Sequence, residues 1–102
     1  MEEKLKSSEL FDKVLERPVL YVGKSSIPLI KAFIAGYEGG TENCYRDDLY
    51  VNFTQWVANR FNIETSHDWS SIISFVAMSE QSAYEMTKEL WQEYKEQESH
   101  DA

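Results

Sequence analysis

Apolar residues recur three and four positions apart in five stretches of the chain, a spacing that places them on one face of an α-helix. The five apolar stripes are Leu10, Phe11, Val14 and Leu15; Leu29, Ile30, Phe33, Ile34 and Tyr37; Leu49, Phe53, Trp56, Val57 and Phe61; Trp69, Ile72, Ile73 and Val76; and Ala83, Tyr84, Thr87, Leu90, Trp91 and Tyr94. Every stripe contains an aromatic residue, which suits helices that share one core. The pattern therefore predicts an all-α fold, a compact bundle of about five helices.

Local signals mark the ends of these helices. Pro18 ends the first one, because the residue before a proline is driven out of the α-helical conformation. Pro28 fits the first turn of the second helix, where its missing N–H is not needed, and Gly39-Gly40 ends that helix. Asp68 and Ser79 precede the last two stripes and are predicted to be N-caps.

Two segments carry a β-like pattern instead. Residues 18–23 form a short apolar, β-branched stretch, which we expect to be an extended connector or a short strand. Residues 45–53 include the run Leu-Tyr-Val-Asn-Phe, so a strand here, in a mixed fold, is the main alternative to the third helix.

The length of 102 residues fits one domain, and 42% hydrophobic residues are enough for a core that needs no disulfide or metal. We therefore expect a single domain over residues 1–102, with a frayed polar tail at residues 97–102. The charged residues 1–6 lack the apolar stretch of a secretory signal, and no apolar run reaches the ~20 residues of a membrane span. The sequence thus predicts a cytoplasmic protein with no membrane contact.

The net charge of −8 should repel nucleic acids and anionic membranes and attract basic partners. The charge is uneven: residues 80–102 carry seven acidic and two basic side chains, and residues 38–48 carry four acidic and one basic. Together these two segments account for the whole net charge. They are either the binding surface for a basic partner or a solvated surface that keeps the protein soluble.

Residues suited to catalysis do not form a recognisable site. Ser66-His67-Asp68 are consecutive, and neighbours in sequence rarely orient one another, so loop and N-cap roles explain them better. The single Cys44 lies among carboxylates, which raise a thiol pKa and weaken the nucleophile. Residues 23–26 are similar to the end of a phosphate-binding loop but lack its opening glycine. We expect no enzymatic activity, no cofactor and no metal.

Four motifs between residues 10 and 95 carry a likeness to known proteins. They are Arg17-Pro18-x-x-Tyr21-x-Gly23-x-x-Ser26-Ile27-x-x-Ile30-x-Ala32-Phe33-Ile34-x-Gly36-Tyr37, Phe53-x-x-Trp56-Val57-x-x-Arg60-Phe61, Trp69-x-x-Ile72-Ile73 and Ser79-Glu80-x-x-Ala83-Tyr84. The chain thereby resembles the small helical immunity proteins of contact-dependent growth inhibition and related polymorphic toxin systems of bacteria. The resemblance implies a protein that binds the C-terminal domain of its cognate toxin 1:1 in the cytoplasm and neutralises it.

Many such toxins are basic nucleases, so the expected partner is a nuclease, such as one that cleaves tRNA, and the protein itself contacts no nucleic acid. The expected partner-binding residues lie in the two acidic segments: Glu38, Glu42, Tyr45, Asp47, Asp48, Glu85, Glu89 and Glu93. Their carboxylates would pair with Lys and Arg, and the tyrosine would add contact area. Two alternatives are a non-catalytic adaptor or regulatory subunit that binds a basic protein, and an enzyme with an unrecognised carboxylate site.

Overall fold

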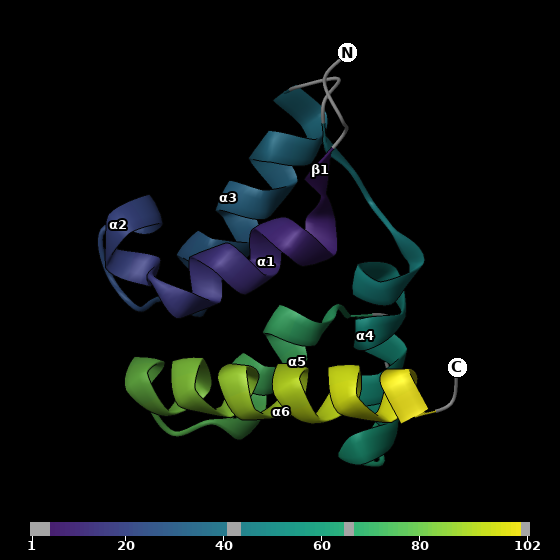
Figure 1. Ribbon diagram of the computed structural model, residues 1–102. Helices are drawn as coiled ribbons and strands as arrows, with labels where there is room; N and C mark the ends of the chain where they lie inside the picture. Colours follow the sequence, from purple (N-terminus) through teal and green to yellow (C-terminus); the bar gives the residue numbers. More distant parts are fainter. Residues whose placement is uncertain (1–4, 41–43, 65–66, 101–102) are drawn as a thin grey trace.

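The computed structural model describes residues 5–40, 44–64 and 67–100. Over these residues the chain forms six helices and two very short strands (Figure 1). In chain order the elements are β1 (Leu5–Lys6), α1 (Ser7–Glu16), α2 (Pro18–Val22), α3 (Ile27–Gly40), β2 (Cys44–Tyr45), α4 (Asp48–Arg60), α5 (Trp69–Val76) and α6 (Glu80–His100). The prediction of an all-α bundle is confirmed, with one helix more than expected.

A cluster of aromatic rings joins four of the helices. The Phe11 ring of α1 has its centroid 4.7, 4.8 and 5.3 Å from those of Trp91, Trp69 and Tyr50. Phe53 of α4 packs against Trp91 with a centroid distance of 5.0 Å. Since α1, α4, α5 and α6 all contribute rings, burying them fixes these helices relative to one another.

The predicted N-caps of the last two helices are confirmed. Asp68 accepts a hydrogen bond from the Ser71 backbone N–H at 3.1 Å, and the Ser79 hydroxyl accepts one from the Ser82 N–H at 3.0 Å. The Asp68 carboxylate also lies 3.5 Å from the Lys31 ammonium. Asp68 therefore caps α5 and ties that helix to α3.

Residues 18–23 are not the extended connector that the sequence predicted. Pro18 occupies the start of α2, where its fixed φ angle already suits a helix. Gly23 follows the helix with φ 88°, a left-handed conformation that glycine adopts at little cost, and its N–H donates to the Val19 carbonyl at 3.1 Å. These two flanking residues override the β-propensity of the valines between them.

The strand alternative for residues 45–53 is also wrong for most of its length. Only Cys44–Tyr45 is a strand, paired in parallel with Leu5–Lys6, and α4 begins three residues later. The helix prevails because Tyr50, Phe53 and Val57 then share one buried face.

The C-terminal helix continues through His100, beyond the point at which the tail was expected to fray. Two contacts with α4 hold this end. The Trp56 indole N–H donates to the Gln97 side chain at 2.9 Å, and the Tyr94 hydroxyl donates to the Leu49 carbonyl at 2.6 Å. None of the helices in the described ranges has both the length and the hydrophobicity to cross a lipid bilayer.

Candidate partner-binding surface

Glu38, near the end of α3, is not the exposed carboxylate that the sequence predicted. Its side chain is only 11% exposed. It accepts a hydrogen bond from the buried Ser7 hydroxyl and lies 3.6 Å from the Arg46 guanidinium. Because its charge is compensated inside the fold, we assign Glu38 to structure.

Asp47 is likewise used within the fold. It occupies the N-cap position of α4, but its carboxylate accepts hydrogen bonds from the Ser8 N–H at 2.9 Å and the Ser8 hydroxyl at 2.5 Å. The N-cap residue of α1 is Lys6, whose side chain cannot accept a hydrogen bond. Asp47 therefore supplies the acceptor that the start of α1 lacks, and ties α1 to α4.

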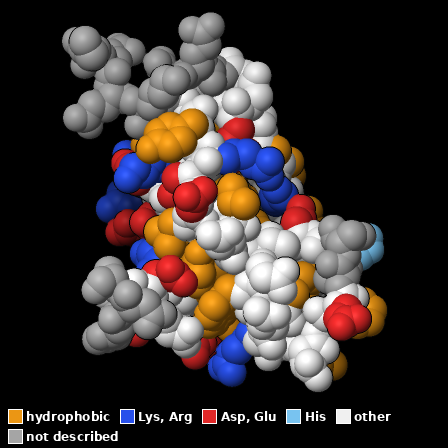
Figure 2. Space-filling view, turned by 90° about the vertical axis from the view of Figure 1, so that its right-hand side faces the viewer, with side chains coloured by type: hydrophobic (Ala, Val, Ile, Leu, Met, Phe, Trp, Pro, Cys, Tyr) orange, Lys and Arg blue, Asp and Glu red, His pale blue; other side chains and the backbone are white. Residues whose placement is uncertain are grey.

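Tyr45 and Asp48 remain at the surface beside this cap. Tyr45 is 40% exposed. Asp48 is exposed in the first turn of α4, where its negative charge interacts favourably with the helix dipole. Glu42 lies outside the described residues. On the face of the molecule seen in Figure 2, acidic and basic side chains lie close together, with hydrophobic ones between them, so the charges there partly cancel.

The outer face of α6 carries the other predicted carboxylates. Glu85 and Glu89 are exposed, and Glu93 is half-buried at 3.6 Å from the Arg60 guanidinium. The exposed Glu96 extends the same row by one turn. Residues three or four apart share one side of a helix, so these four form a single surface, the α6 acidic face.

The two lysines of α6 do not neutralise this face. The Lys88 ammonium lies 5.4 Å from the centroid of the Tyr84 ring, and the Lys95 ammonium bonds to Asp12 of α1 at 2.6 Å. Glu85, Glu89 and Glu96 have no cationic partner among the residues that the structure describes. The α6 acidic face therefore keeps an uncompensated negative charge.

Hydrogen bonds from aromatic side chains fix α6 to the rest of the molecule. The Tyr84 hydroxyl donates to the Leu15 carbonyl at 2.5 Å, and the Trp91 indole N–H donates to Asp12 at 2.6 Å. With the Tyr94 bond to α4, they secure the helix along its length. The carboxylates are thus held on a fixed support, which lowers the entropy lost when a partner binds.

Tyr94 also shows that the two acidic segments meet at one end of α6. Burial, together with the nearby carboxylates of Glu98 and Asp47, raises the pKa of its hydroxyl to about 12. Figure 1 shows the same arrangement, with the C-terminal end of α6 beside α4. The C-terminal end of α6 therefore lies beside the start of α4, whose first residue is Asp48.

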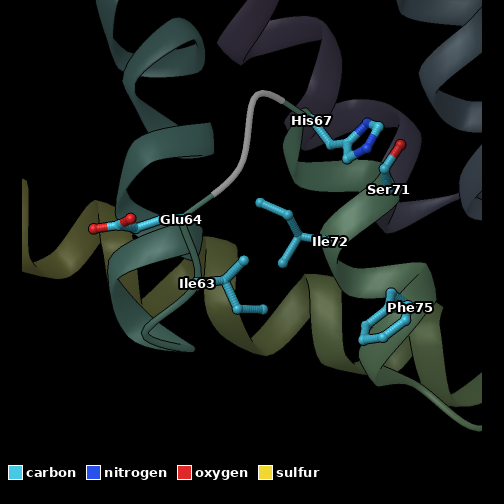
Figure 3. A pocket seen from close by; sticks show the side chains of 6 residues that line it. All are labelled: Ile63, Glu64, His67, Ser71, Ile72 and Phe75. Carbon is cyan, nitrogen blue, oxygen red and sulfur yellow. The ribbon is translucent and has the colours of Figure 1, made fainter.

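A groove between the end of α4 and α5 was not predicted (Figure 3). It has a volume of about 500 Å³ and is lined by Ile63, Glu64, His67, Ser71, Ile72 and Phe75. Figure 3 shows the Ile63 and Ile72 side chains converging, Phe75 at one end and the Glu64 carboxylate turned outward. Phe75 is 86% exposed, and Met78 beyond it is 97% exposed. Exposed apolar groups of this size are typical of binding sites.

Cys44 lies in the interior beside β1. Burial raises the pKa of its thiol; a hydrogen bond with Ser7 opposes this rise, and the Glu38 and Asp47 carboxylates add to it. Such a thiol is a poor nucleophile. Within ranges 5–40, 44–64 and 67–100, no three His, Cys, Asp or Glu side chains converge on a possible metal site.

No protein-family model, curated protein or solved structure matches this chain.

Proposed function

We propose that this protein is an immunity protein: it binds the toxic C-terminal domain of a polymorphic toxin, a basic nuclease, in the cytoplasm and blocks its activity. The α6 acidic face is the observation that carries this proposal. Three of its four carboxylates have no described cationic partner, and the helix beneath them is fixed to the core. The motif resemblance supplies the class of partner.

The geometry of the α6 acidic face suits competition with a polyanionic substrate. Consecutive carboxylates stand about 4.5–6 Å apart along the helix axis, and the row from Glu85 to Glu96 spans roughly 16 Å. A nuclease holds its substrate with Lys and Arg side chains that neutralise phosphates. A row of carboxylates on a fixed helix offers these side chains an alternative set of ion pairs.

The charge also favours rapid capture of such a partner. Opposite fields accelerate encounter by about 10-fold or more at low salt. Tyr45 and Asp48 add exposed polar surface near the start of α4, and an exposed tyrosine adds contact area at a small entropic cost. Glu38 and Asp47 contribute to the negative field but are committed to bonds within the fold.

The test uses the toxin domain encoded directly upstream. The purified protein should form a 1:1 complex with it and abolish its nuclease activity at equimolar ratio. A Glu85→Lys/Glu89→Lys variant should bind at least about 10-fold more weakly while keeping its thermal stability, since both side chains are exposed.

A matched control is Glu9→Lys/Glu16→Lys, which changes the net charge equally but on the exposed side of α1. It should bind almost as well as the wild type. A complex that leaves the nuclease fully active would favour the adaptor function instead. The absence of any complex would contradict the proposal.

A further inference from the structure

We propose that the groove between α4 and α5 is the apolar anchor site of the toxin interface. Its occupant is an apolar side chain of the toxin domain that is flanked by Lys or Arg. This inference rests on the proposed function for the identity of the partner. The contact that it assigns is made by Ile63, Ile72 and Phe75, and not by the carboxylates of the α6 acidic face.

Phe75 has no evident role in folding. Its helix already buries Trp69, Ile72 and Ile73 on the side that faces the core, whereas the Phe75 ring is 86% exposed. A phenylalanine ring buries roughly 150 Å² or more when it is covered. Covering this ring with a partner therefore gains apolar burial that the folded monomer does not obtain.

The groove has the size and lining of a site for a few side chains. Its volume of about 500 Å³ lies within the usual range for ligand pockets. Ile63 and Ile72 form an apolar floor, and Phe75 closes one end (Figure 3). Ser71 and His67 line the other end, and the exposed Ser71 hydroxyl offers a polar contact there.

The charge around the groove selects a basic occupant. Glu64, at its outer edge, has no cationic partner within the described segments. The basic residue nearest in sequence, Arg60, is already paired with Glu93. A Lys or Arg beside the inserted side chain would therefore find an uncompensated carboxylate.

The same ion pair joins the end of α4, which leads into the groove, to the α6 acidic face. Glu93 belongs to that face, and Arg60 is the last residue of α4, three positions before Ile63. One partner surface can therefore contact both regions, with an apolar centre and charged surroundings. This is the arrangement in which a single buried aromatic group dominates binding energy.

The test compares Phe75→Ser with Leu20→Ser in binding to the upstream-encoded toxin domain. Leu20 is a fair control because it is 70% exposed and lies on α2, which does not line the groove. Phe75→Ser should raise the Kd at least about 10-fold, mainly through faster dissociation, and Leu20→Ser should leave it within about 2-fold. Melting temperatures should be unchanged, since both side chains are exposed.

Two further variants separate the apolar and charged contributions. Phe75→Leu keeps an apolar side chain and should retain most of the affinity. Glu64→Lys should slow association, whereas Glu16→Lys, with the same charge change on α1, should not. Equal effects of Glu64→Lys and Glu16→Lys would overturn the assignment of a basic occupant.

The outcomes distinguish this inference from the proposed function. If the wild type binds and inhibits the toxin domain but Phe75→Ser binds equally well, the groove is not the anchor and the proposed function stands. If the wild type does not bind the toxin domain at all, both proposals fall.

Discussion

The Phe11 side chain is fully buried among rings from three other helices. Phe11→Ala should lower the free energy of unfolding by about 3–5 kcal/mol, because it removes a large apolar group and leaves a cavity. Trp56, at the rim of the same cluster, is half-buried and stacks on Phe53 with a centroid distance of 6.2 Å. Trp56→Ala should cost about half as much. Urea unfolding measures the loss of stability in both variants. Equal losses would contradict the placement of Phe11 at the centre of the core and Trp56 at its rim.

Asp68 makes stability depend on pH. Burial alone would raise the pKa of its carboxyl, but hydrogen bonds from Ser70 and Ser71 and the Lys31 charge outweigh burial, so the pKa lies below the ordinary 3.8. The ionised form is therefore favoured by folding. Its stabilising effect is present above about pH 4 and is lost as the pH falls through the lower folded-state pKa.

Asp68→Ala should consequently lower the free energy of unfolding by about 1 kcal/mol at neutral pH, the usual cost of losing an N-cap. The difference from the wild type should shrink between neutral pH and an acidic pH below the folded-state pKa, where the carboxyl is protonated in both states. Denaturant unfolding of both proteins at the two pH values measures this difference in the free energy of unfolding. A difference that grows in acid would show that Asp68 does not act through its charge.

At the scale of the helices, α1 depends on an acceptor supplied from another element. Asp47→Ala should lower the free energy of unfolding by about 1–2 kcal/mol, since the Ser8 N–H and hydroxyl lose their partner. Asp48→Ala, one residue later and exposed, should change stability by less than about 0.5 kcal/mol. Thermal unfolding compares the two. Equal effects would mean that Asp47 is merely another surface charge.

The C-terminal cap of α2 provides a second test at this scale. Gly23 has φ 88°, so Gly23→Ala should destabilise the fold by about 1 kcal/mol. Gly36 lies inside α3 with open space around it, so Gly36→Ala should stabilise the fold by roughly 0.5–1 kcal/mol. Denaturant unfolding gives the sign of each change. The same sign for both would contradict the conformations assigned here.

Helices were predictable where the signals are local. Asp68 and Ser79 lie directly before their apolar stripes and cap the neighbouring turn, so sequence spacing alone located α5 and α6. The single turn of α2 was missed because Val19 and Val22 favour strands and only the flanking Pro18 and Gly23 impose the helix. The β1–β2 pair joins segments almost forty residues apart, and two-residue strands leave no periodic pattern.

At the scale of the whole molecule, the position of the acidic segments was predictable from the sequence. Which of their carboxylates form bonds inside the fold was not. Glu85 and Glu89 could be placed on an exposed face because their spacing opposes the apolar stripe of α6. Nothing local reveals that Glu38 and Asp47 bond to Ser7 and Ser8, because those contacts form only in the tertiary structure. Phe75 left one trace: it lies off the apolar stripe of its own helix.

The association rate with the toxin domain, measured at low and high salt, tests the role of the α6 acidic face most directly. The wild-type rate should fall at least about 10-fold between low and high salt, with little change in dissociation, because exposed carboxylates act mainly on encounter. Glu85→Lys/Glu89→Lys should associate slowly at low salt and respond weakly to added salt. A wild-type association rate that does not change with salt would contradict a role of the α6 acidic face in encounter. Equal association rates for the wild type and the Glu85→Lys/Glu89→Lys variant would contradict it as well.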